Sequence, residues 1–123
     1  MIIWRYQQVL KLLLSGDVVE WARIEFKETW DAAASLKSIC AFANDLDNWG
    51  GGYIVIGVQE DNGRPVFPLK GVQKDKLDSY QKNIFAKCKL LRPAYTPIIG
   101  IETYQDKHFM LYGVLVEITD RIH

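Results

Sequence analysis

The apolar positions of this chain change period several times, and each change marks a structural element. Residues 2–14 have apolar side chains at helical spacing, which predicts an N-terminal helix. Residues 22–27 alternate between apolar and charged side chains, which is typical of a strand with one polar face, and Glu25 lies on that face. Residues 36–43 return to the spacing i, i+3, i+4, i+7 and predict a second helix.

The rest of the chain repeats this order of strand and helix. Residues 53–58 are apolar on both faces and predict an interior strand. Apolar side chains recur at helical spacing over residues 77–91, and two further apolar runs, 97–104 and 108–118, predict a hairpin. After the first helix the predicted order is β-α-β-α-β-β. This order predicts an α+β fold in which helices pack on a mixed four-stranded sheet.

Length and composition limit the class of protein. A chain of 123 residues forms one domain, so a single unit over residues 1–123 is expected. No window holds about 18 uninterrupted apolar residues, and the N-terminus lacks the layout of a signal peptide. We therefore expect a soluble cytoplasmic protein without a membrane segment. Cys40 and Cys88 fall on apolar helix faces without a Cys or His at ligand spacing, which predicts buried thiols.

The charge of the chain is balanced overall but uneven along the sequence. The net charge of zero differs from the basic character of strong nonspecific DNA binders. Residues 64–92, however, hold eight Lys and Arg against two Asp, a net charge of +6, while residues 1–61 lean acidic. A positive side that contacts a phosphate backbone is one interpretation, with an aromatic side chain stacked on a base. The alternative is that these lysines form the solvated flank of a helix.

Four short motifs follow one another along the first half of the chain. They are Glu25-Phe26-Lys27, the run K-S-I-C-A-F-A-N over residues 37–44, Gly51-Gly52-Tyr53 and Ile56-Gly57-Val58. In this order they resemble the Schlafen Alba-type domain, which sits at the front of divergent ATPases, helicase-related proteins and transcriptional regulators. The resemblance implies an Alba-like fold, which agrees with the predicted order of elements. It also implies a longer protein with further C-terminal domains, of which this chain is the N-terminal part.

The resemblance implies a nucleic-acid-related role, so the leading hypothesis is a module that binds DNA or RNA within a regulator or helicase-related protein. On this hypothesis Glu25 holds one of the phosphate-contacting cations, Lys27, in place. The full set of cations expected to contact phosphates is Lys27, Lys37, Lys74, Lys82 and Lys89. No G-x-x-x-x-G-K-[ST] motif occurs in the chain, so the sequence gives no basis for ATP binding.

A second hypothesis is a metal-dependent endoribonuclease. In nuclease members of the Schlafen family, two glutamates and a later acid bind a divalent metal, and here Glu20 and Glu25 have the matching separation. Glu60 and Asp61 are equally eligible as the third acid, because residues 45–49 make the preceding loop longer than is usual in the family. Carboxylates suit Mg²⁺ or Mn²⁺, which prefer oxygen ligands and activate a bound water.

The nuclease hypothesis has a geometric condition and a simpler rival. Residues five apart on one regular strand point to opposite faces, so Glu20 joins Glu25 only if it precedes the strand. In the rival interpretation Glu25 pairs with Lys27 or Arg23 on a solvated face, while Glu60 and Asp61 form a turn. A third hypothesis is a structural domain that forms a homodimer through the hairpin edge 108–118 and has no affinity for nucleic acid.

Overall fold

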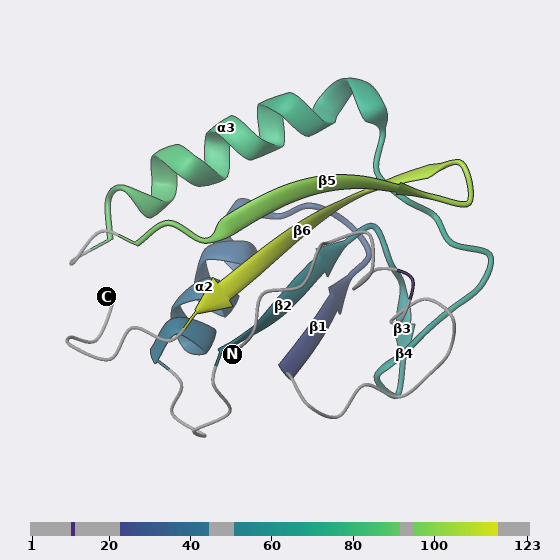
Figure 1. Ribbon diagram of the computed structural model, residues 1–123, viewed down its shortest axis with the longest axis horizontal. Coiled ribbons are helices and arrows are strands. Elements are labelled where there is room, and N and C mark those ends of the chain that lie inside the picture. Colours follow the sequence, from purple (N-terminus) through teal and green to yellow (C-terminus); the bar gives the residue numbers. More distant parts are fainter. Residues whose placement is uncertain (1–10, 12–22, 45–50, 92–94, 116–123) are drawn as a thin grey trace.

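The computed structural model describes residues 11, 23–44, 51–91 and 95–115 (Figure 1). Its centre is a four-stranded sheet with the strand order β1-β2-β6-β5. The strands are β1 (Arg23–Lys27), β2 (Gly51–Ile56), β5 (Ile98–Tyr104) and β6 (Lys107–Leu115). The pair β1 and β2 is parallel, whereas β2 with β6 and β6 with β5 are antiparallel. The predicted mixed sheet is therefore confirmed.

Two helices, α2 (Ala32–Asn44) and α3 (Leu77–Cys88), cover one face of the sheet, and the short 3₁₀ turn η1 (Lys74–Lys76) leads into α3 (Figure 1). Ile39 of α2 and Ile84 of α3 are buried against Ile54 of β2 and Tyr112 of β6. The predicted α+β architecture is confirmed by this two-layer core. The predicted helix over residues 2–14 lies, apart from Lys11, outside the described residues.

A small hairpin of β3 (Glu60–Asp61) and β4 (Arg64–Pro65) follows β2. The sequence predicted a turn at Glu60 and Asp61 but no strands here. Asn62 and Gly63 both have positive φ, 53° and 80°, which is the conformation that a two-residue hairpin turn requires. Because the turn contains only two residues, the two residues before it pair with the two residues after it as short antiparallel strands.

The opposite face of the sheet has its own apolar cluster. Tyr53 and Val55 of β2 are buried there with Phe109 and Leu111 of β6. Since β2 also buries Ile54 and Ile56 on the helix side, both of its faces are buried, and the predicted interior strand is confirmed.

We expected residues 108–118 to form a free sheet edge for dimerisation. This prediction is wrong for residues 108–115, which are the part of that range that the structure describes. β6 pairs with β2 on one side and with β5 on the other, so its backbone groups serve two ladders within the sheet. The strands at the two ends of the sheet are β1 and β5. A second copy that added to this sheet beside the hairpin would therefore meet β5.

Aromatic contacts fix the start of α2 on the sheet. Asp31 caps the helix, because its Oδ1 accepts a hydrogen bond of 2.9 Å from the backbone N–H of Ala34. The Trp30 ring stacks on Tyr80 of α3, with ring centroids 4.5 Å apart and planes 5° apart. Its Nε1 also donates a hydrogen bond of 3.2 Å to the hydroxyl of Tyr112 on β6. Trp30 thus connects α2, α3 and the sheet.

Both cysteines are free thiols, and Cys88 is buried, as the sequence predicted. Burial, with a smaller contribution from the charge of the nearby Cys40, raises the pKa of the Cys88 thiol from 9.0 to about 11. Cys40 is only partly buried, and burial raises its pKa as well. Burial also raises the pKa of the Tyr112 hydroxyl, from 10.0 to about 12, although the hydrogen bond from Trp30 opposes the change.

These raised pKa values predict a loss of stability in alkaline solution. In the unfolded chain the Cys88 thiol ionises near pH 9.0, whereas in the folded protein it ionises only near pH 11. Between these values the unfolded state binds fewer protons, so the free energy of unfolding falls as the pH rises, and Cys88 by itself accounts for about 2–3 kcal/mol of this fall at most. Urea unfolding followed by circular dichroism across this range measures the change. Cys88→Ala should flatten the profile more than Cys40→Ala does, and identical profiles would contradict this assignment.

No helix in the described part of the chain combines the length and the apolar character needed to cross a membrane.

Candidate functional site

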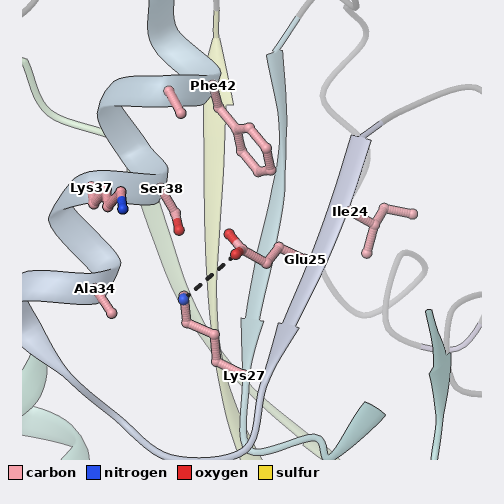
Figure 2. A pocket seen from close by; sticks show the side chains of 8 residues that line it. Ile24, Glu25, Lys27, Ala34, Lys37, Ser38 and Phe42 are labelled. Carbon is pink, nitrogen blue, oxygen red and sulfur yellow. Dashed lines mark ion pairs between the residues drawn. The ribbon is translucent and has the colours of Figure 1, made fainter. Parts of the chain in front are cut away.

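A cavity of about 520 Å³ lies between β1 and α2 (Figure 2). Its lining combines charged, hydroxyl and apolar side chains that come from one strand and one helix. The described residues that line it are Ile24, Glu25 and Lys27 of β1, and Ala34, Lys37, Ser38, Ala41 and Phe42 of α2. The charged groups of the first motif therefore meet the helix of the second motif.

The cavity arises because α2 is displaced sideways relative to the sheet. Strand pairing places Glu25 beside Ile54 and Lys27 beside Ile56, so both charged side chains lie on the helix-covered face. The contacts of α2 with the sheet are made mainly to β2 and β6 rather than to β1. A space therefore remains between α2 and the strand at the end of the sheet. The predicted polar face of this strand is confirmed, but it faces a helix across a cavity and not open solvent.

Glu25 and Lys27 form an ion pair inside this cavity. The distance between Glu25 Oε1 and Lys27 Nζ is 3.6 Å, and the Lys27 side chain is only 18% exposed, compared with 39% for Glu25. At this distance the two charges attract each other, but the contact is too long for a hydrogen bond. The carboxylate therefore keeps its capacity to accept hydrogen bonds from another partner. The expected pairing of Glu25 with Lys27 is confirmed.

The helical wall adds a second cation and a hydroxyl group. Lys37 is exposed at the rim of the cavity, while Ser38 points into the space between α2 and β1 (Figure 2). Ile24 points away from α2, to the other side of β1. The described lining thus carries two ammonium groups and one carboxylate. The excess of positive charge favours an anion, and the carboxylate favours a ligand that also offers hydrogen-bond donors.

The other predicted cations lie elsewhere. Lys74 is exposed in η1, and Lys82 and Lys89 are exposed on α3 or directly after it. Lys82 forms an ion pair of 3.0 Å with Asp78 one turn earlier on the same helix. The structure brings Lys27 and Lys37 to one cavity, while the other three lysines belong to the α3 side of the helical layer.

The predicted metal ligands are not assembled by the described residues. Glu60 and Asp61 are exposed on β3 and do not line the cavity, and Glu20 lies outside the described residues. Within residues 11, 23–44, 51–91 and 95–115, no group of three His, Cys, Asp or Glu side chains is placed to hold a metal ion. A metal site formed by Glu20, Glu25 and either Glu60 or Asp61 stays a prediction.

Ser38 was missed as a site residue, although the sequence contains a signal for it. Ala34, Lys37, Ser38 and Ala41 recur at helical spacing beside the apolar core stripe and form a second stripe of small and polar side chains. Small side chains on a helix leave space between the helix and the sheet. A stripe of this kind next to the E-F-K strand is therefore a usable sign of a cavity.

Comparison with known proteins identifies the family. The model of the family described as Schlafen, AlbA_2 matches residues 20–122. The solution NMR structure of the N-terminal domain of a Nitrosomonas europaea protein, described as related to the ATP-dependent DNA helicase RecG, is 27% identical with a TM-score of 0.69. That match covers 97% of this chain and 78% of the other.

A more distant structure shares the fold alone. The crystal structure of the DIP2311 protein from Corynebacterium diphtheriae has a TM-score of 0.56 at 16% identity, over 95% of this chain and 23% of the other. The search of curated proteins gave no match. Because the family model spans most of the sequence and the fold agrees with that of its structural relatives, the chain belongs to the Schlafen AlbA_2 family.

Proposed function

We propose that this domain binds nucleic acid through the cavity between β1 and α2, as one module of a larger helicase-related protein. Lys27 and Lys37 contact phosphate oxygens, and Glu25 holds the Lys27 ammonium in place. The family membership and the likeness to a RecG-related N-terminal domain support this role. Both DNA and RNA fit the proposal, because phosphate contacts carry most of the affinity in either case.

The observation that carries the proposal is the position of the Lys27 ammonium. It is mostly shielded from solvent, lies 3.6 Å from the Glu25 carboxylate and shares a cavity with Lys37. A shielded charge interacts more strongly with a phosphate than a fully hydrated one does. A chain of zero net charge provides no general attraction for a polyanion, so a local cluster of this kind is what binding requires.

Charge reversal at Lys37 tests the proposal. Lys37→Glu should weaken binding of a fluorescently labelled oligonucleotide at least about tenfold at low salt, because one phosphate contact is replaced by a repulsion. The dependence of affinity on salt should also become shallower. Fluorescence anisotropy titrations at two salt concentrations measure both effects, and circular dichroism confirms that the variant is folded.

The matched control is Lys82→Glu, which makes the same charge change on α3. The Lys82 side chain is 78% exposed and already paired with Asp78, so its replacement should change the affinity less than about twofold. A larger loss for Lys82→Glu than for Lys37→Glu would move the interface to α3 and contradict the cavity assignment. No binding by the unmodified domain at micromolar concentration and low salt would contradict the proposed function itself.

A further inference from the structure

We infer that the cavity between β1 and α2 accepts one unstacked nucleotide of a single strand, and that Glu25 contacts its base. This inference rests on the proposed function and specifies which form of nucleic acid the site takes. Three features carry it: the size of the cavity, the depth of Lys27 and the hydrogen-bonding capacity of Glu25.

The volume of the cavity exceeds what a phosphate group needs. At about 520 Å³ it falls within the range of about 300–1,000 Å³ that is typical of pockets for whole small molecules. Its lining is also mixed, since Ala34, Ala41 and Phe42 add apolar surface beside the charged groups. A ligand that fills this space therefore has both an anionic part and a flat, largely apolar part, as a nucleotide does.

The depth of Lys27 discriminates between single and double strands. Its side chain is 18% exposed, and it lies between a strand and a helix. Duplex phosphates project from a stiff convex surface, so they meet the exposed Lys37 at the rim more easily than Lys27. A single strand turns freely about its backbone bonds and can place a phosphate and a base inside the cavity.

The carboxylate of Glu25 determines which part of the nucleotide lies beside it. An ionised carboxylate only accepts hydrogen bonds and repels phosphate, whereas it pairs well with the exocyclic amino group of a base. The 3.6 Å contact with Lys27 leaves its oxygen atoms able to accept such a bond. Cytosine offers this amino group, while thymine offers a carbonyl oxygen in its place. The base thus lies toward Glu25, with its phosphate toward Lys27 and Lys37.

Three labelled probes test the inference: oligo-dC, oligo-dT of equal length, and the oligo-dC·oligo-dG duplex. Anisotropy titrations should show oligo-dC bound about threefold to tenfold more tightly than oligo-dT, which is the lower part of the discrimination expected for one base contact. Both single strands should bind more tightly than the duplex. Glu25→Ala should abolish the preference for oligo-dC. Because this change also releases Lys27 from its ion pair, it affects the phosphate contact of both strands alike, so the ratio of the oligo-dC and oligo-dT affinities is the readout.

Glu28→Ala is the matched control, because Glu28 is an exposed acid of the same segment that pairs with Lys70 outside the cavity. This variant should keep the oligo-dC preference. Equal affinity of the unmodified domain for oligo-dC and oligo-dT, or a duplex bound at least as tightly, would overturn the inference. The proposed function would still stand in that case if Lys37→Glu weakens binding. Failure of all three probes to bind would overturn both.

Discussion

Gly57→Ala is expected to lower the free energy of unfolding by about 2–5 kcal/mol, one of the two largest effects predicted for this domain. Gly57 has φ of +111°, which side-chain-bearing residues rarely adopt. A Cβ at this position would lie 3.0 Å from the Gly71 backbone and 3.1 Å from the Phe109 ring. Neither neighbour moves easily, because the Gly71 N–H donates a hydrogen bond of 2.8 Å to the Gly57 carbonyl and Phe109 is buried.

Gly63→Ala is the matched control for this prediction. Gly63 also has a positive φ, +80°, but a Cβ added there would meet no atom within 4 Å. Its replacement should cost about 1 kcal/mol, from backbone conformation alone. Urea unfolding followed by circular dichroism measures both variants. An equal loss in the two variants would show that the close approach of Gly57 and Gly71 does not limit stability.

Trp30→Ala is expected to lower the free energy of unfolding by about 3 kcal/mol. The change removes the stacking on Tyr80 and the hydrogen bond to the Tyr112 hydroxyl together. It also leaves an opening where α2, α3 and the sheet meet. Because these contacts fix the start of α2, the helical wall of the cavity should shift, and oligonucleotide binding should weaken along with stability.

Trp30→Phe separates the two contributions. A phenyl ring keeps an aromatic face against Tyr80 but cannot donate to Tyr112, so we expect a loss of about 1 kcal/mol from the hydrogen bond. Urea unfolding and oligonucleotide titration on both variants provide the measurement. A Trp30→Ala loss no larger than that of Trp30→Phe would mean that the stack contributes little.

Much of the fold follows from local periodicity. Alternation over residues 22–27 predicted β1, which the structure places at Arg23–Lys27, and helical spacing predicted α2 and α3. The hairpin of β3 and β4 was missed, because strands of two residues are too short to show a period. Periodicity also gives no spatial order, which explains why β6 was expected at an edge although it lies between β2 and β5.

The candidate site was predictable in part. Glu25, Lys27 and Lys37 were singled out from the motifs, but their meeting at one cavity depends on the sideways position of α2 over β2 and β6. No local pattern encodes that offset, because it results from side-chain packing between distant elements. The lysines of residues 74–89 were grouped with them by charge alone. In the structure these lysines lie in η1, in α3 or directly after α3.

The described lining of the cavity comes entirely from residues 24–42, one strand and the helix that follows it. Segments this close in sequence need little loop-closure entropy to come near each other. The β2 and β6 ladder, in contrast, joins residues more than fifty positions apart. The two walls of the site, β1 and α2, can therefore approach each other without the rest of the sheet. The distance between them is set only when β6 completes the surface against which α2 packs.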